Sequence, residues 1–251
     1  MCRLLGVVSR TDAPIAALVQ DELAPFLDLS AEHAHGWGIG WVAADGRVDI
    51  RKEPVQASED RRFADTVTST VTDASLLHIR QASPGMPLIP SNTHPFLADD
   101  LCFAHNGYAW TAATMDTLVR ESGAPRPLGD TDSERYLSLV RASLVEHGAP
   151  DALRQAAELI AERASFTSLN CLLLVPGALY ALAWWHAPTI RAQPDGETET
   201  DYRLWYRVDT DRVLVASAGM QGHDAGWREL PHEHVLEVRR DTLETTVHGP
   251  R

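Results

Sequence analysis

Three things are scarce in this sequence, and each scarcity excludes a class of protein. The 251 residues include only three cysteines, Cys2, Cys102 and Cys171, without a CxxC pair, so we expect no disulfide framework and a reducing, cytoplasmic compartment. No run of about 18 apolar residues is present, so no membrane span is expected. The N-terminus lacks a basic region followed by a long apolar stretch, so we expect no signal peptide.

Basic residues are also few. The chain has 22 Lys and Arg against 35 Asp and Glu, which gives a formal net charge of -13. Nucleic acids and anionic membranes both reward basic surfaces, so neither is expected as a partner.

The most informative feature present is Met1 followed by Cys2. If Met1 is removed, Cys2 carries both a thiol and a free α-amine, whose pKa is about 7.7–8.0 in model compounds. The thiol can then act as the nucleophile and the amine as its base, without a catalytic histidine. A cysteine at this position also arises by chance, so other parts of the chain have to supply the remaining groups of a catalytic site.

The order of predicted elements is strands, then a helical block, then further strands. Hydrophobic periodicity and turn signals predict strands at 3–9, 36–43, 48–52, 75–80, 101–105, 171–175, 179–185, 204–208, 213–216, 234–238 and 242–247. The same signals predict helices near 16–26, 59–70, 131–146 and 150–164, a loop at 83–95 and an exposed acidic loop at 187–201. The order does not alternate βαβα, so we expect an α+β fold of two antiparallel sheets flanked by helices. No linker or internal repeat divides the chain.

Three groups in the sequence could serve a cysteine nucleophile. Asn106 and Gly107 follow a predicted buried strand, where a side-chain amide and an unhindered backbone N–H could stabilise an oxyanion, although Asn-Gly also makes tight turns. Arg80 ends another predicted buried strand and could bind a carboxylate, or form a structural salt bridge. Asp132 opens a predicted helix and could bind an ammonium group, or cap the helix. Arg80 and Asp132 together would recognise both charged ends of an α-amino acid.

The histidines raise the possibility of a metal. His33 and His35, and likewise His232 and His234, form H-x-H pairs. A metal hydrolase remains a hypothesis, but HExxH is absent and no carboxylate accompanies the pairs at hydrolase spacing. We therefore expect no catalytic metal. Trp184-Trp185 is expected to pack at the end of a strand.

Six segments in order resemble class II glutamine amidotransferases, which are N-terminal-nucleophile hydrolases. They are Met1-Cys2-Arg3-Leu4-Leu5-Gly6, His35-Gly36-Trp37-Gly38-Ile39, His78-Ile79-Arg80, Asn92-Thr93-His94-Pro95-Phe96, His105-Asn106-Gly107 and Thr131-Asp132-Ser133-Glu134. The resemblance covers at least residues 2–140 and is greatest to the compact, stand-alone members, such as the γ-glutamyl hydrolase of the ergothioneine pathway. It implies a four-layer αββα sandwich and one domain over residues 1–251.

The resemblance also implies roles. Cys2 would be the nucleophile, Asn106 and Gly107 the oxyanion hole, Arg80 and Ser83 the carboxylate site, and Asp132 the ammonium site. The reaction would be hydrolysis of glutamine or a γ-glutamyl conjugate through a thioester on Cys2. No cofactor is implied. Ammonia could pass to a separate synthase subunit.

Two departures from the family pattern affect this expectation. His35 stands where the family often has aspartate, and residues 30–34 lack the arginine that many members have upstream of Gly-Trp-Gly. The alternative hypothesis is therefore a catalytically silent glutamine-binding or regulatory partner on the same fold.

Overall fold

Two antiparallel sheets form the centre of the molecule. The computed structural model describes residues 2–83, 85–193, 196–217 and 226–250. The larger sheet has seven strands in the order β13-β11-β12-β1-β4-β2-β3. Their bounds are β1 Arg3–Pro14, β2 Trp37–Val42, β3 Val48–Glu53, β4 Val71–Ile79, β11 Leu204–Val208, β12 Arg212–Ser217 and β13 Arg228–Glu229.

The second sheet has six strands in the order β15-β14-β10-β9-β6-β5. Their bounds are β5 Phe96–Ala98, β6 Leu101–Asn106, β9 Asn170–Val175, β10 Ala178–Ala183, β14 His234–Arg239 and β15 Thr245–His248. Two short strands, β7 Ala109–Trp110 and β8 Ser165–Phe166, pair separately beside it.

The two sheets pack face to face and share an aliphatic core. Alternate residues of each strand point into this core, as the period of two in a strand requires. Leu4 and Val8 of β1 contribute from the larger sheet, and Ala104 of β6 and Leu172 of β9 from the smaller one. Gly6 allows this close packing, because a Cβ there would lie 2.8 Å from a methyl group of Leu179.

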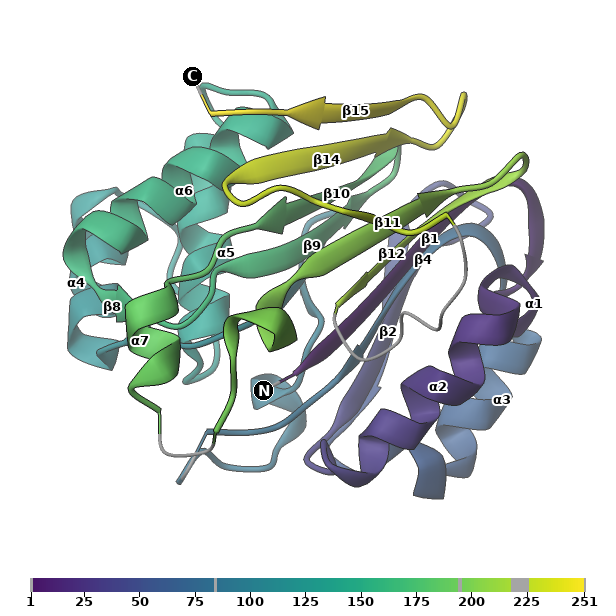
Figure 1. Cartoon of the computed structure of the whole chain (residues 1–251), viewed down its shortest axis with the longest axis horizontal. Helices are drawn as coiled ribbons and strands as arrows, with labels where there is room; N and C mark the ends of the chain where they lie inside the picture. Colours follow the sequence, from purple (N-terminus) through teal and green to yellow (C-terminus); the bar gives the residue numbers. More distant parts are fainter. Residues whose placement is uncertain (1, 84, 194–195, 218–225, 251) are drawn as a thin grey trace.

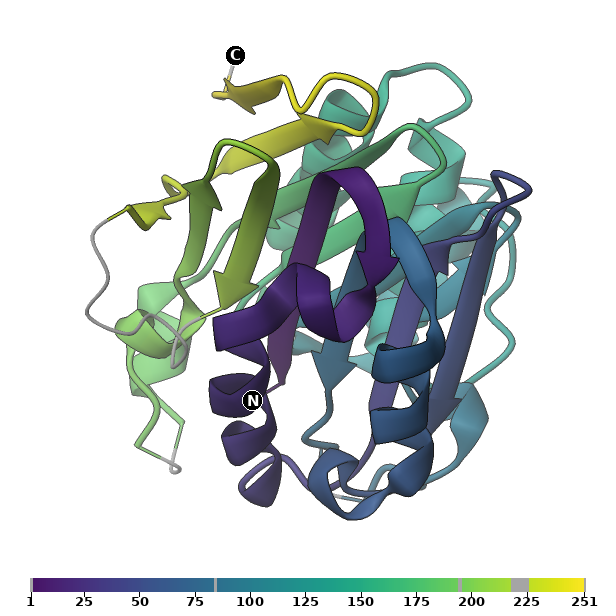
Figure 2. The same ribbon diagram turned by 90° about the vertical axis from the view of Figure 1, so that its right-hand side faces the viewer.

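Helices cover the outer face of each sheet. Helices α1 (Ile15–Val19), α2 (Leu23–Asp28) and α3 (Arg61–Ser69) cover the larger sheet, as Figure 2 shows. Helices α4 (Ala112–Glu121), α5 (Asp132–Ser143) and α6 (Ala149–Arg163) cover the smaller sheet, at the left in Figure 1. The predicted four-layer αββα sandwich is confirmed.

Some local predictions were wrong. Residues 187–201 are not a simple loop, because they contain α7 (Ala187–Arg191) and a 3₁₀ turn at Glu199–Tyr202. The predicted helix over 16–26 is interrupted: α1 and α2 are separated by a 3₁₀ turn at Gln20–Glu22. Helix α4 was not predicted.

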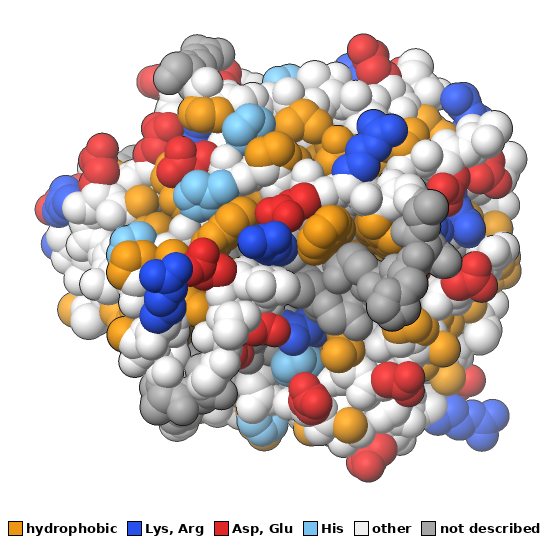
Figure 3. All heavy atoms as spheres, viewed as in Figure 1, with side chains coloured by type: hydrophobic (Ala, Val, Ile, Leu, Met, Phe, Trp, Pro, Cys, Tyr) orange, Lys and Arg blue, Asp and Glu red, His pale blue; other side chains and the backbone are white. Residues whose placement is uncertain are grey.

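The surface charges and the state of the cysteines in the described residues are those that the composition predicts. Asp and Glu side chains are spread over the face in Figure 3, with Lys and Arg scattered among them. Cys2, Cys102 and Cys171 are free and buried. Among the described residues, no helix has the length and apolar character needed to cross a membrane.

Candidate active site

Cys2 directly precedes β1 and points into the space between the sheets. Leu4, two residues later on the same strand face, belongs to the core between the sheets, so the Cys2 side chain points the same way. Cys2 is 7% exposed, and its thiol donates a hydrogen bond to the carbonyl of Gln81 over 3.6 Å. Burial raises the pKa of the Cys2 thiol, and nearby Arg80 acts in the opposite direction. The resting group is therefore a neutral thiol that needs a base.

Arg80 follows β4 and lies next to Cys2. Arg3 pairs with Ile79 in the antiparallel register, so the next position along the two strands brings Cys2 opposite Arg80. The Arg80 backbone N–H donates to Gly36 O over 2.8 Å, and its carbonyl accepts from His35 N over 3.0 Å. Its side chain is buried, and Nη1 has no hydrogen-bond partner among the described residues. A buried guanidinium nitrogen without a partner is suited to an incoming carboxylate.

Asn106, the last residue of β6, points into the same space from the other sheet. Cys102 and Ala104, on the same face of β6, belong to the core between the sheets. Asn106 is fully buried, yet neither polar atom of its amide has a hydrogen-bond partner in the described part of the chain. An amide buried in this way costs about 1–3 kcal/mol, which a ligand could offset.

The ends of β1, β4 and β6 meet at one edge of the sandwich. His78, which pairs with Leu4 in the register between β1 and β4, lies beside the backbone of His105 in β6. The thiol of Cys2, the Arg80 guanidinium and the Asn106 amide therefore share one end of the space between the sheets. The structure thus brings together three of the predicted site residues.

Gly107 continues directly from Asn106 and is needed for steric reasons. A Cβ at this position would lie 1.9 Å from the carbonyl oxygen of Ser168. Its φ of 157° is likewise one that side-chain-bearing residues rarely adopt. The Asn-Gly pair therefore ends a strand in close backbone contact, rather than simply forming a hairpin turn.

Asp132 is the first residue of α5 and contacts the segment that follows Gly107. Its Oδ2 accepts a hydrogen bond from Ala109 N over 2.8 Å. The helix cap is Thr131, whose hydroxyl accepts from Glu134 N, so Asp132 is not the cap. The Glu134 carboxylate accepts instead from the backbone of Leu128 and Gly129, so the reciprocal half of a capping box is not made. The half-buried Asp132 carboxylate keeps acceptor capacity for an ammonium group.

His105 fixes this arrangement, although we assigned it no role from the sequence. Its Nε2 lies 2.9 Å from Ser168 O, so that nitrogen carries the proton and donates to the carbonyl. Its Nδ1 then accepts from the Ser133 hydroxyl over 3.0 Å. One imidazole ring thereby connects β6 to the start of α5 and to the carbonyl against Gly107. The alternation of faces along 102–106 could have shown that His105 points toward the helices.

His35 supports the segment after Arg80. Its Nδ1 accepts a hydrogen bond from Ala82 N over 3.1 Å. This contact holds residues 81–83 next to Cys2, whose thiol donates to Gln81 O. Ser83 ends this segment half-buried, and its carbonyl accepts from Met86 N over 3.0 Å. The histidine therefore supplies a hydrogen-bond acceptor at the position where the resemblance led us to expect a carboxylate.

The stretch without the expected arginine contains a buried histidine. Burial, helped by nearby Arg3, lowers the pKa of His33 to about 3, so the ring is neutral at physiological pH. Arg3 donates from Nη1 to the carbonyl of Cys2 over 3.2 Å. A guanidinium thus contacts the backbone of Cys2 from within β1. Met1, whose removal the predicted mechanism requires, lies outside the described residues.

The histidine pairs do not assemble a metal centre. The described residues contain no group of three or more His, Cys, Asp or Glu side chains placed to bind a metal ion. His78 and His94 stack with ring centroids 4.2 Å apart, and burial lowers the pKa of both.

Comparison with known proteins gives a family and a fold. The family model described as glutamine amidotransferases class-II matches residues 1–250. A γ-glutamyl-hercynylcysteine sulfoxide hydrolase of Mycobacterium tuberculosis is 26% identical over 265 residues, covering 100% of both chains. A glutamine aminotransferase class-II domain protein of Silicibacter pomeroyi superposes with a TM-score of 0.69, 18% identity and coverage of 99% and 100%. The glutamine phosphoribosylpyrophosphate amidotransferase of Bacillus subtilis gives a TM-score of 0.64 at 15% identity, covering 98% of this chain and 49% of that one.

Proposed function

The chain belongs to the class II glutamine amidotransferases, and from that premise we propose that it hydrolyses a γ-glutamyl amide through a thioester on Cys2. The substrate is glutamine or a γ-glutamyl conjugate. The products are glutamate and either ammonia or a larger amine.

One observation carries the proposal: at one end of the space between the sheets, Cys2 lies with buried polar groups that have no partner among the described residues. These groups are the Asn106 amide and Nη1 of Arg80. A structural role would pair them, because an unpaired buried polar group is destabilising. A ligand with an oxyanion and a carboxylate would give both groups partners.

The first step is attack of the Cys2 sulfur on the γ-carbonyl carbon. Because burial raises the pKa of the thiol, a base has to accept its proton, and the α-amine of Cys2 is that base once Met1 is removed. The Asn106 amide and the Gly107 N–H donate to the oxygen that becomes negative. The carbon–nitrogen bond then breaks, and the protonated α-amine returns the proton to the leaving amine. The γ-glutamyl thioester remains.

Water completes the reaction. The α-amine of Cys2, now neutral, accepts a proton from the water as its oxygen attacks the thioester carbonyl. The thiolate leaves and takes up that proton, which regenerates the enzyme and releases glutamate. Arg80, with the hydroxyl of Ser83, binds the α-carboxylate of the glutamyl group, and Asp132 binds its ammonium group.

The relatives support hydrolysis over a silent binding partner. The M. tuberculosis relative, named a hydrolase of a γ-glutamyl compound, matches over the whole chain. We further propose that residues 1–251 act as one domain in the cytoplasm, which agrees with the free thiols. Delivery of ammonia to a separate synthase remains a prediction.

The test is glutamate release from glutamine and a panel of γ-glutamyl amides. Cys2→Ala should abolish turnover, because the Cys2 sulfur is the atom that attacks the carbonyl carbon. Cys102→Ala is the matched control: that thiol is buried in β6, and its loss should leave activity and fold intact. A diazoketone analogue of glutamine should add one label, on Cys2.

Two results would contradict the mechanism. One is activity that survives in Cys2→Ala. The other is an intact mass showing that Met1 is retained in fully active protein, because the amine of Cys2 would then be part of a peptide bond.

A further inference from the structure

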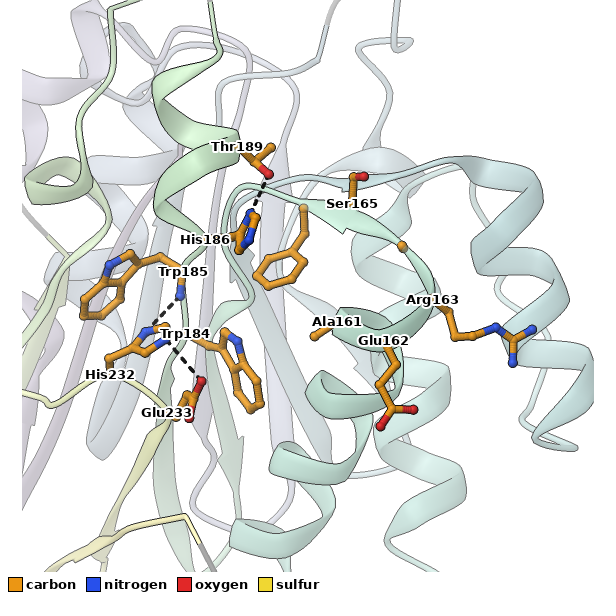
Figure 4. A pocket seen from close by; sticks show the side chains of 12 residues that line it. Ala161, Glu162, Arg163, Ser165, Trp184, Trp185, His186, Thr189, His232 and Glu233 are labelled. Atoms are coloured by element: carbon orange, nitrogen blue, oxygen red, sulfur yellow. Dashed lines mark hydrogen bonds and ion pairs between the residues drawn. The ribbon is translucent and has the colours of Figure 1, made fainter.

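An open cleft of about 560 Å³ lies on the outer side of the segment around Ser168, the residue whose carbonyl contacts Gly107. It is formed by the end of α6, by β8, by residues 184–189 and by the turn before β14. Figure 4 shows these segments, which are far apart in sequence, around one hollow. The proposed hydrolysis gives it no role.

One wall of the cleft is aromatic. Trp184 follows β10 and is half-buried, and its indole faces the hollow opposite Ala161 in Figure 4. The His232 ring lies 6.3 Å from Trp184 and 4.4 Å from Trp185, measured between ring centroids. Phe166 of β8 also lines the cleft. Indole and phenyl faces attract cations, and indole does so most strongly.

The charged side chains of the cleft leave a net negative charge. Glu162 and Glu233 both line it, and Arg163 is the described cationic side chain in the lining. The Arg163 guanidinium is already paired with Glu121 over 3.1 Å and points away from the hollow in Figure 4. The two cleft carboxylates are therefore not neutralised by it.

His232 does not neutralise Glu233 either. The backbone N–H of Trp185 donates to His232 Nδ1 over 3.3 Å, so the ring proton is on Nε2, which lies 3.3 Å from the Glu233 carboxylate. Burial lowers the pKa of His232, although Glu233 acts in the opposite direction. Because its Nδ1 accepts from Trp185, the His232 ring is a neutral imidazole that donates from Nε2 to the Glu233 carboxylate.

We propose that this cleft binds a small organic cation that carries a methylated ammonium group, with Trp184 supplying the aromatic face and Glu233 and Glu162 the charge. An anion would be repelled by both carboxylates. A metal ion is not favoured, because the described residues supply no group of three ligands.

Ser168 lies between the cleft and the proposed oxyanion segment and contacts both. Ser168 forms a β-bridge with Trp185 on the cleft side, and its carbonyl lies against Gly107 on the other side. Because Ser168 contacts both places, the cation has two possible sources. It is a free small molecule, or it is the amine half of a substrate whose γ-glutamyl group lies at the oxyanion segment.

The direct test is binding of choline, compared with the uncharged alcohol in which carbon replaces the choline nitrogen. Calorimetric titration should show saturable choline binding and at least about tenfold weaker binding of the alcohol. Trp184→Leu and Glu233→Gln should each weaken choline about tenfold. Trp227→Leu is the matched control, because that indole already contacts an internal cation, with Arg207 5.1 Å from its ring centroid; this variant should bind choline as the unchanged protein does.

A further variant separates binding from folding. Glu233 has a φ of 62°, a conformation that glycine adopts without strain. Glu233→Gly should therefore fold at least as stably as the unchanged protein while binding choline more weakly. Equal binding of choline and the uncharged alcohol, or unchanged binding in Trp184→Leu, would overturn the proposal.

The two sources of the cation give different kinetics. If choline raises the KM for a γ-glutamyl amide with a methylated ammonium in its amine half, but not for glutamine, the cleft holds the amine half of the substrate. If neither KM changes while choline binds, the ligand is a separate molecule. Binding itself is measured without the reaction, so this test stands if the proposed hydrolysis fails.

Discussion

The space between the two sheets has an aliphatic half and a polar half. The side chains of the aliphatic half contact one another, whereas polar atoms in the other half have no partner among the described residues. In the aliphatic half, Leu172, Leu179 and Val215 are fully or almost fully buried in mutual contact. At the polar end, Arg80 and Asn106 are equally buried but have polar atoms without partners in the described structure.

The difference indicates what each half does. Burial of aliphatic side chains contributes about 25 cal/mol per Å² of apolar surface, so the first half stabilises the fold. The second half costs stability, as expected of polar groups held ready for a ligand. Perturbed titratable groups gathered in one place are typical of functional sites.

The sharpest contrast is between Asn106→Leu and Leu172→Ala. Asn106→Leu should lower kcat by about 10²–10³, since it removes an oxyanion donor. Its free energy of unfolding should stay the same or rise, because an unpaired amide is lost. Leu172→Ala should instead lose about 2–5 kcal/mol of stability through the cavity it creates. Urea denaturation and initial rates measure both effects.

A stable fold with unimpaired activity in Asn106→Leu would remove this residue from the mechanism. A large loss of stability in the same variant would show that its amide is structurally paired, and the contrast between the two halves would disappear.

Acid should affect the polar half more than the aliphatic half. Burial lowers the pKa of His78 to about 3 and that of His94 well below its ordinary value. An unfolded histidine has a pKa near 6.5, so below that pH the unfolded chain binds more protons. The free energy of unfolding should therefore fall as the pH drops, by about 1.4 kcal/mol per pH unit for each such histidine.

His94→Phe tests this dependence. The ring stacks on His78 and makes an edge contact with Phe96, so a phenyl ring suits the position. Urea denaturation at several pH values between about pH 4 and pH 6 gives the free energy of unfolding as a function of pH. In His94→Phe this free energy should change less steeply with pH than in the unchanged protein, by about one bound proton. An unchanged slope would mean that His94 does not titrate on unfolding.

The smallest expected effect concerns the support of residues 81–83. His35→Leu removes the acceptor for Ala82 N and should raise KM several-fold with less change in kcat, because the segment beside Arg80 loosens. His35→Asn is the control, since its amide oxygen can accept the same hydrogen bond. Equal kinetics in both variants would exclude positioning through this bond.

Much of the fold could be predicted because its signals are local. Periodic apolar residues predicted β1, β2, β6 and the helices over 131–164, and β1 begins at Arg3 as expected. Helix α4 could also have been found, since Met115, Leu118 and Val119 have helical spacing and are buried. Helix α7 is only five residues long, too short to show periodicity.

The candidate site residues could be picked out from the sequence one by one, and their roles stay predictions, but the contacts that support them could not be predicted. Cys2, Arg80, Asn106 and Asp132 stood out by residue type and by their place at element ends. The acceptor role of His35 and the two hydrogen bonds of His105 depend on neighbours up to 63 residues away in sequence. No local pattern encodes such pairs.

By itself, the sequence determined that a cysteine follows the first methionine, where most strands and the helices over 131–164 form, and which side chains have the chemistry for a γ-glutamyl amide. Only the tertiary structure decided that Cys2, Arg80 and Asn106 share one end of the space between the sheets. It alone also placed residues 161–166, 184–189 and 232–233 around one cleft. The physical reason is that strand register and sheet packing, which create these contacts, join segments far apart in the chain.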